Sequence, residues 1–187
     1  MPARALPHRP LLPALLTALV PLGLLAVLTA ACTAPRGPQT IALPGGGRGL
    51  PGTVTHVVDG DTVDLQIGDT TERARLLGID TPETVKPDTP VQCYGPEASA
   101  RTKALLPPGT AVVVQRDREA RDRYGRLLVY LWRRRDHLFV NGSLVGDGYA
   151  RTLSIAPNTS HQADLAAQMD AARTAGAGLW GTCPPDG

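Results

Sequence analysis

Polar and apolar residues in the middle of the chain alternate with the period of a β-strand. Val63, Leu65 and Ile67 are separated by single polar residues, which gives this segment one buried face. Residues 54–58 just before it are rich in β-branched side chains, and Gly-Asp at 68–69 is typical of a turn. The same reasoning predicts three more strands, over residues 72–77, 111–116 and 127–132.

Three helices are predicted among and after these strands. The first begins near Pro96, because proline suits a first helical turn, and it ends before Pro107. A short helix is expected over residues 141–147, although glycines weaken it, and a last one over residues 160–174. Five strands interleaved with short helices indicate a small α+β domain around a closed or nearly closed barrel.

The first 31 residues have the features of an export signal. Arg4 and Arg9 precede an uncharged, mainly apolar run that ends in small residues. A permanent transmembrane helix is the alternative, because the run is long enough to span a bilayer. Prolines and a glycine interrupt it, however, and no cluster of positive charges follows. Residues 1–31 are therefore predicted to be a cleaved signal peptide.

The residues before Cys32 resemble a bacterial lipobox, in which the cysteine carries lipid and becomes the new N-terminus. Thr29 stands where that motif more often has leucine. Lipid attachment at Cys32 and simple secretion therefore both remain open. Either one predicts an extracellular or cell-surface protein, with the membrane as a partner only through the lipid.

A flexible tether is predicted to follow. Residues 33–52 contain 10 Gly or Pro among 20 positions and show no periodic apolar pattern. We therefore expect a tether over residues 32–52, a folded domain over residues 53–183 and a short tail over residues 184–187.

Charge excludes one class of protein. The whole chain has 19 basic and 17 acidic residues, and two of the basic ones lie in the predicted signal, so 19 − 2 = 17 balance 17. A neutral mature chain is not held on nucleic acid by bulk charge, although a local basic cleft is compatible with this balance.

Two cysteines remain once Cys32 is set aside. Cys93 and Cys183 are 90 positions apart, and neither has a second Cys or His at the spacing of a zinc site. A disulfide that ties the C-terminal tail to the middle of the domain is predicted, with two separate free thiols as the alternative.

Four polar clusters interrupt the strand pattern, and each alone fits an ordinary turn. Together they supply carboxylates, whose oxygens favour Ca²⁺ or Mg²⁺ over zinc, and arginines, which fork onto phosphate oxygens. One further carboxylate can act as a base towards water. These are the parts needed to stabilise a phosphoryl-transfer transition state. The clusters are Asp59-Gly60-Asp61, Arg73-Ala74-Arg75, Asp80-Thr81-Pro82-Glu83 and Asp122-Arg123-Tyr124-Gly125-Arg126.

The order and spacing of the motifs resemble the staphylococcal nuclease (thermonuclease) family over about residues 53–183. The resemblance implies an OB-fold, a five-stranded barrel with three helices. It also implies a Ca²⁺-dependent phosphodiesterase that cuts DNA and RNA and leaves 3′-phosphate ends. The motifs that carry it are VVDGDTV at 57–63, RLLGIDTPE at 75–83, YGPEAS at 94–99 and DRYGR at 122–126.

By this resemblance Asp61 and Asp80 are the calcium carboxylates, and the Thr81 carbonyl is a third ligand. Asp59 matches an acidic residue that shapes the metal site without being a principal ligand.

Five other positions match residues that act on the substrate. Glu83 matches the general base on the attacking water, and Arg75 and Arg126 match the two arginines that contact phosphate. Tyr124 matches a tyrosine bordering the nucleotide pocket, and Arg123 stands where a lysine is common.

The chain departs from the best-known member at Leu153 and Ile155, where that protein has tyrosines near the bound base. Loss of these rings is expected to weaken nucleotide stacking, at about 1–3 kcal/mol per base.

Two other classes of protein compete with an enzyme. One is a catalytically inactive nucleic-acid-binding module of the same fold, and the other is a surface lipoprotein whose carboxylates bind Ca²⁺ for stability alone. All five catalytic and metal positions are present, which favours the enzyme. A monomer is expected, and a backbone clamp does not rank DNA against RNA.

Overall fold

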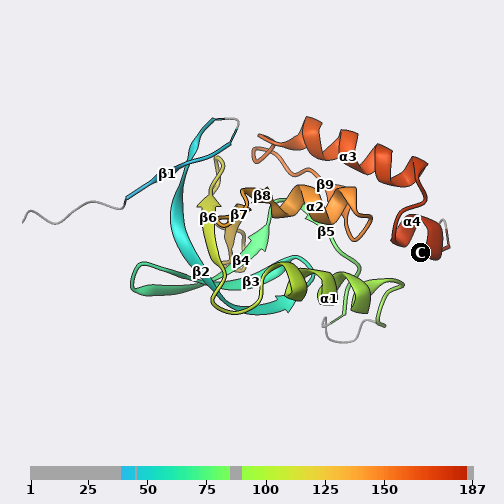
Figure 1. Ribbon diagram of the computed structural model, residues 1–187, viewed down its shortest axis with the longest axis horizontal. Helices are drawn as coiled ribbons and strands as arrows, with labels where there is room; N and C mark the ends of the chain where they lie inside the picture. The colour runs from blue at the N-terminus through green and yellow to red at the C-terminus, as the bar shows by residue number, and fades with distance from the viewer. Residues whose placement is uncertain (1–38, 45, 85–89, 185–187) are drawn as a thin grey trace, which may run out of the picture. The chain divides into compact units, whose positions relative to one another are not determined.

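Five strands of the chain wrap into a closed barrel (Figure 1). The computed structural model of the protein describes residues 39–44, 46–84 and 90–184. The strands pair in the order β2, β3, β4, β7, β6, and β6 pairs with β2 to close the ring. The predicted five-stranded barrel is thus confirmed. Its strands are β2 (Arg48–Asp59), β3 (Thr62–Ile67), β4 (Thr70–Leu76), β6 (Ala111–Gln115) and β7 (Leu127–Arg133).

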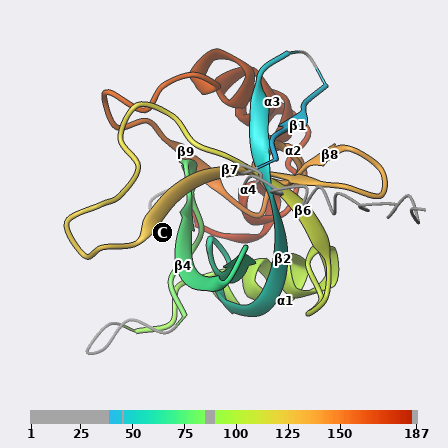
Figure 2. The same cartoon turned by 90° about the vertical axis from the view of Figure 1, so that its left-hand side faces the viewer.

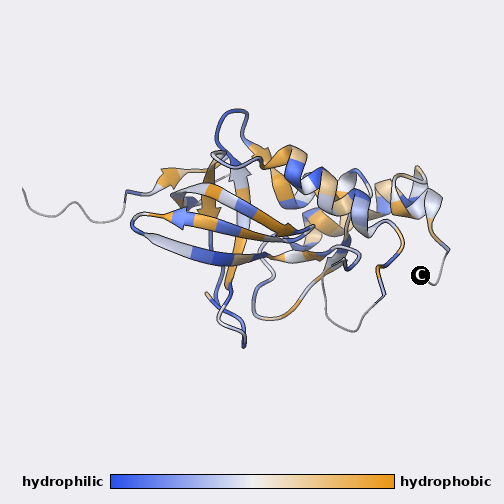
Figure 3. Ribbon diagram, turned by 90° about the horizontal axis from the view of Figure 1, so that it is seen from below, coloured by the Kyte–Doolittle hydropathy of each residue, from blue (hydrophilic) through white to orange (hydrophobic). Residues whose placement is uncertain are grey.

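The barrel forms because its strands alternate between apolar and polar residues. Val63 and Leu65 on β3 are fully buried, and so are Val112 on β6 and Val129 on β7. Figure 3 shows this alternation as orange and blue-to-white segments along the strands. Each buried aliphatic side chain of this kind contributes about 1.5–3 kcal/mol to folding.

Helices lie on one side of the barrel, and α2 packs between α1 and α3 (Figure 1). The three predicted helices are confirmed, within two residues at each end. The structure adds a single-turn helix close to the C-terminus, which is too short to show a helical pattern in the sequence. The helices are α1 (Gly95–Leu105), α2 (Val140–Gly146), α3 (Gln162–Thr174) and α4 (Leu179–Thr182).

A separate two-stranded sheet positions Asp80. β5 (Gly78–Asp80) pairs antiparallel with β9 (Arg151–Leu153), and Asp80 lies opposite Arg151. Neither strand was predicted, because three residues are too few to show an alternation. β5 follows β4 after one residue, so the sheet carries Asp80 close to the end of the barrel.

The predicted tether is wrong for its C-terminal part. β2 begins at Arg48, its residues Leu50 and Gly52 pair with Val114 and Val112 of β6, and β1 (Ile41–Ala42) pairs with the start of β2. In the pairings of the described residues, Pro51 has β6 as its one neighbour, so its missing N–H breaks no second ladder. The Gly and Pro content concealed this edge segment. A two-residue strand β8 (Leu138–Phe139) on β7 was also not predicted.

The predicted signal peptide over 1–31, the proposed lipid site Cys32 and tail residues 185–187 lie outside the described residues. Among the helices of the described part, none is both long and apolar enough to cross a membrane.

Asn141 ties α2 to the barrel from inside the core. It is fully buried, its Oδ1 accepts from the Leu131 backbone N–H at 2.9 Å, and its Nδ2 donates to the Leu77 carbonyl at 2.9 Å. Buried backbone groups of this kind are costly when they lose their partners. One amide side chain thus satisfies a backbone N–H inside β7 and the carbonyl of the residue between β4 and β5.

Changing Asn141 to alanine is expected to lower the free energy of unfolding by about 2–4 kcal/mol, because two buried backbone groups lose their partners. Urea unfolding followed by circular dichroism measures this. Gln66→Ala is the control, since that amide is exposed and bonds only locally, to Gly68 and Thr71. Equal losses in the two variants would contradict the role of Asn141.

Candidate active site

Asp61 lies in the turn from β2 to β3, and its buried carboxylate reaches the residue after β5. The Thr81 backbone N–H and hydroxyl donate to Asp61 Oδ2 at 3.0 and 3.1 Å. Gly60 permits this approach, because a Cβ there would lie 2.6 Å from the Thr81 hydroxyl oxygen. The Asp-Gly-Asp sequence is therefore more than a turn: it brings a carboxylate against the β5 end.

Arg75 on β4 joins two carboxylates from different elements. Its Nη1 contacts Asp61 Oδ1, and its Nη2 donates to Asp80 Oδ1 at 2.6 Å. The Arg75 side chain is 17% exposed and that of Asp80 is 56% exposed, so the cluster runs from the interior to the surface. Both predicted metal carboxylates thus converge on a single cationic group.

Burial is the main reason that the pKa of Arg75 lies below its usual value, and the hydrogen bond and charge of Asp80 oppose this shift. The positive charge of Arg126 lowers the same pKa, and the Glu83 carboxylate raises it. An arginine titrates so far above neutral pH that Arg75 stays charged. Arg126 and Glu83 also line the same pocket as Arg75.

Glu83 belongs to a segment fixed by hydrogen bonds on both sides. The Thr84 hydroxyl donates to Asp59 Oδ1 at 2.6 Å, and the Thr84 N–H donates to Glu83 Oε1 at 3.0 Å. The Glu83 N–H donates to Gln92 Oε1 at 2.8 Å. Asp59, which is buried, therefore anchors the segment that carries Glu83, in keeping with a residue that shapes the site.

The long loop from β6 to β7 brings Arg126 to the site, and Asp122 organises its tip. Asp122 Oδ1 accepts the backbone N–H groups of Tyr124 and Arg126 at 3.0 and 2.9 Å, and Oδ2 accepts Arg126 Nε at 2.7 Å. Burial alone would raise the pKa of Asp122, but these bonds from Arg126 outweigh it and lower the pKa. Asp122 is thus held ionised, and it fixes the direction of the arginine.

Most of the predicted site residues line one open pocket of about 520 Å³, in the size range of small-molecule sites. Arg123 is not among the lining residues; its guanidinium lies 4.8 Å from the centre of the exposed Tyr124 ring. Arg73 lines the pocket although no role was predicted for it, and its place two residues before Arg75 on one strand was the available signal. The lining residues are Val58, Asp59, Asp61, Thr62, Arg73, Arg75, Asp80, Thr81, Glu83, Tyr124 and Arg126.

The pocket offers oxygen donors to a cation. Among the described residues, no three His, Cys, Asp or Glu side chains are grouped to hold a metal together. Asp61 and Asp80 nevertheless approach the same positively charged group from two sides. Carboxylate oxygens, a backbone carbonyl and water are the ligands that Ca²⁺ takes, so the donor chemistry fits this ion.

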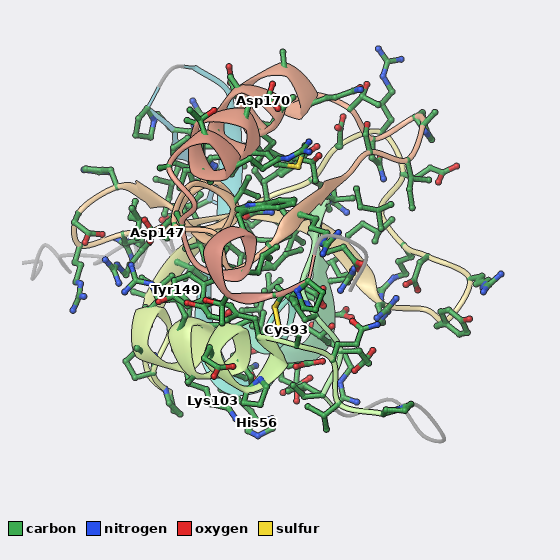
Figure 4. All side chains as sticks on the ribbon, turned by 90° about the vertical axis from the view of Figure 1, so that its right-hand side faces the viewer. His56, Cys93, Lys103, Asp147, Tyr149 and Asp170 are labelled. Atoms are coloured by element: carbon green, nitrogen blue, oxygen red, sulfur yellow. A yellow bond between two sulfur atoms is a disulfide. The ribbon has the colours of Figure 1, made fainter. Side chains whose placement is uncertain are left out.

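The two cysteines and the two departures are not among the residues that line this pocket. Cys93 and Cys183 form a disulfide with their Cα atoms 5.9 Å apart, as predicted. Figure 4 shows it next to the start of α1. Leu153 at the end of β9 is 40% exposed and Ile155 is 63% exposed, and neither lines the pocket.

Comparison with known sequences decides the family. Residues 73–182 match the family described as staphylococcal nuclease homologue. The chain belongs to the staphylococcal nuclease family. Over 115 residues it is 45% identical to a thermonuclease of Staphylococcus intermedius, spanning 62% of this chain and 67% of that protein.

Further nuclease relatives come from two genera. A thermonuclease of Staphylococcus hyicus is 38% identical over 127 residues, 68% of this chain and 73% of its own length. Endonuclease YncB of Bacillus subtilis strain 168 is 37% identical over 110 residues, 58% of this chain and 51% of its own length. The resemblance inferred from the motifs is confirmed, and the chain is a nuclease.

Proposed function

We propose that the protein is an exported, calcium-dependent, sugar-non-specific endonuclease that hydrolyses DNA and RNA and leaves 3′-phosphate ends. One observation carries this proposal. A single pocket gathers Arg75 of β4, Asp61 of the β2–β3 turn, Asp80 of β5, Glu83 of the segment after β5, and Arg126 of the β6–β7 loop.

The arginines are suited to a phosphodiester. A guanidinium presents a planar fork that matches two phosphate oxygens, and Arg75 of β4 and Arg126, which directly precedes the neighbouring strand β7, both line the pocket. Together they would stabilise the negative charge that builds up on the phosphoryl oxygens during attack. Contacts of this kind go to the backbone, so they serve DNA and RNA alike.

Glu83 is the proposed general base. It would take a proton from the water that attacks phosphorus, while the bond to the 5′-oxygen breaks and that oxygen receives a proton. The 3′-oxygen keeps its phosphate, which gives a 3′-phosphate and a 5′-hydroxyl. Asp59 contributes by holding Thr84, the residue after Glu83.

Asp61 and Asp80, with the Thr81 carbonyl, are the proposed Ca²⁺ ligands. A bound Ca²⁺ supplies a further positive charge for the phosphate oxygens and polarises water. Tyr124 borders the same pocket, where its exposed ring can stack on a base. Arg123 lies over that ring and would act on the substrate only through it or through a neighbouring phosphate.

Metal removal tests the proposal. Purified protein with Ca²⁺ is expected to cut both plasmid and single-stranded DNA, and a chelator should lower the rate at least about 100-fold because the carboxylates alone polarise nothing. Gel analysis measures cutting, and 3′-ends that a polymerase extends only after phosphatase treatment identify the product. Restored activity on adding excess Ca²⁺ is the control. Undiminished cutting in chelator would overturn the metal assignment.

Export can be tested at Cys32. If that residue carries lipid, Cys32→Ser should move the protein from the membrane fraction to the medium, as immunoblots of the two fractions would show. A wild-type protein found entirely in the medium would contradict lipid attachment and leave simple secretion. Gel filtration tests the proposed monomer.

A further inference from the structure

A second hollow, which we call the arginine groove, lies where the β6–β7 loop begins. It has a volume of about 430 Å³ and is lined in part by Thr40, Arg48, Arg116, Asp117 and Arg118. The Arg48 side chain is bonded to Thr40: its Nε donates to Thr40 Oγ1 at 2.6 Å, and its Nη2 donates to the Thr40 carbonyl at 3.2 Å. Thr40, just before β1, and the first residues of the β6–β7 loop thus line the same hollow.

The groove carries more positive than negative charge. In the described part of the chain, Arg48, Arg116 and Arg118 take part in no ion pair. Its one carboxylate, Asp117, is engaged elsewhere, since it accepts the Ser160 N–H at 3.0 Å and the Ser160 hydroxyl at 2.8 Å. Three cations therefore face a single anion that is already hydrogen-bonded.

Two other surface arginines of the same barrel have a carboxylate partner. Arg73 forks onto Asp64 at 2.9 and 3.2 Å, and Arg121 forks onto Glu72 at 2.7 and 2.9 Å. These hydrogen bonds raise the pKa of both arginines. The arginine groove differs from these two sites, because among the described residues none of its three arginines forms an ion pair.

The groove and the active-site pocket lie at the two ends of one loop. Figure 2 shows this loop leaving β6 beside β2 and reaching out past β4. Arg118 and Arg126 are eight positions apart, so at most about 28 Å separates them. Phosphates of one strand of B-form DNA follow each other every 3.4 Å or so along the axis, so about eight phosphates or fewer would connect the two sites.

We propose that the arginine groove binds the phosphodiester backbone of the substrate strand at phosphates other than the one that is cut. This inference rests on the proposed function. It gives the neutral chain a local cationic track for long nucleic acids, and it carries no sequence preference because the contacts go to phosphate.

Binding measured without cleavage tests the groove. The probe is a single-stranded DNA of about 40 nucleotides, in chelator, by fluorescence anisotropy, and Arg116→Gln/Arg118→Gln should raise Kd about fivefold. The salt slope of log Kd should fall by about one unit or more, for two lost phosphate contacts. The control is Arg134→Gln/Arg135→Gln, with the same charge change at the opposite end of β6, where Arg134 N bonds the Ala111 carbonyl.

A dinucleotide cleaved with Ca²⁺ supplies the second arm. Its single phosphodiester is the one that is cut, so it leaves no further phosphate for the groove, and its kcat/KM should stay within about twofold of wild type in both double variants. Equal Kd changes in the two double variants, or a dinucleotide affected as much as the long strand, would overturn the proposal. If the wild type itself cut neither substrate, the proposed function would fail instead.

A different observation concerns the backbone around Glu83. Gln92 brackets that residue with two hydrogen bonds: its Oε1 accepts the Glu83 N–H at 2.8 Å, and its own N–H donates to the Glu83 carbonyl at 3.0 Å. Gly95 packs against the same segment, because a Cβ there would lie 3.0 Å from the Glu83 oxygen. Cys93, bonded to Cys183, lies between these two contacts in the chain.

We infer that Gln92 is a positioning residue for Glu83, and that the Cys93–Cys183 disulfide keeps Gln92 in place. This inference also rests on the proposed function. The disulfide joins the segment beside Glu83 to the residue that follows α4, so α4 becomes part of the support of the active site. A base displaced by a fraction of an ångström acts less well on its water.

Kinetics of the reacting centre test this. Gln92→Leu and Cys93→Ser/Cys183→Ser should each lower kcat about tenfold with KM within about twofold, because orientation and not binding is lost. Gln92→Glu keeps an oxygen acceptor of the same reach, so it should retain most of the wild-type kcat. Circular dichroism before each assay confirms that the variants are folded.

The decisive measurement repeats the changes in a Glu83→Gln background. There Gln92→Leu should have no further effect on kcat, since the group it positions is gone. Full additivity, or a Gln92→Glu variant as slow as Gln92→Leu, would overturn the inference. A Glu83→Gln variant with wild-type kcat would instead remove the base assigned in the proposed function.

Discussion

Changing Arg126 to lysine is expected to lower kcat at least about 100-fold while the protein still folds. The structure gives the reason. Arg126 Nε donates to Asp122 Oδ2 at 2.7 Å. This bond fixes the edge of the guanidinium that carries Nε, and so sets the direction of its other end. A lysine ammonium has no such edge, and it offers a point charge where the phosphate needs a planar fork.

The separate effects of Arg126→Lys on kcat and on KM identify the role of Arg126. A contact made mainly in the transition state lowers kcat more than it raises KM when it is lost. Steady-state cleavage of a labelled oligonucleotide with saturating Ca²⁺ measures both, and Arg75→Lys should behave in the same way. Arg101→Lys is the control, because Arg101 on α1 pairs with Asp147 outside the pocket. Near-wild-type turnover of Arg126→Lys would mean that Arg126 is not part of the proposed phosphate clamp.

Much of the barrel was predictable because its strands follow a simple rule. Val63 and Leu65 alternate with polar neighbours and are buried, and residues 111–116 and 127–132 match β6 and β7 to within one residue. The start of β2 was hidden, since Pro51 and its neighbouring glycines indicate a linker by composition alone. The start of β2 is nevertheless a strand, because it pairs with β6 and closes the barrel. A pairing between segments about 60 residues apart cannot be detected from the sequence of either segment alone.

The sequence motifs identified most of the residues that line the pocket, but they did not show which of these residues contact one another. Asp61 and Asp80 were expected as a metal pair, yet nothing in the sequence placed Arg75 in contact with both. The contact between Gln92 and Glu83 was not predictable either, because the sequence between these two residues shows no helix or strand pattern that would bring them together. Arg123 was assigned from the resemblance, as the residue that stands where a lysine is common, and the structure places it over the Tyr124 ring and not among the residues that line the pocket.

Changing Asp61 to asparagine should have an effect of similar size, through a different cause. Asparagine keeps an oxygen that can accept the Thr81 N–H, so the β5 end stays in place, while the negative charge next to Arg75 is lost. A carboxylate that holds a catalytic cation is worth several kcal/mol, so kcat is expected to fall about 10²–10³-fold.

The Ca²⁺ dependence distinguishes this from a loss of the arginine clamp. The Ca²⁺ concentration for half-maximal activity should rise at least about tenfold in Asp61→Asn, because a neutral amide oxygen binds the ion more weakly than a carboxylate, and remain unchanged in Arg126→Lys. Calorimetric Ca²⁺ titration should show the same order without any substrate. Asp147→Asn, outside the pocket, is the control for a lost surface carboxylate. Equal Ca²⁺ requirements for Asp61→Asn and wild type would mean that Asp61 supports Arg75 and Thr81 and does not bind the ion.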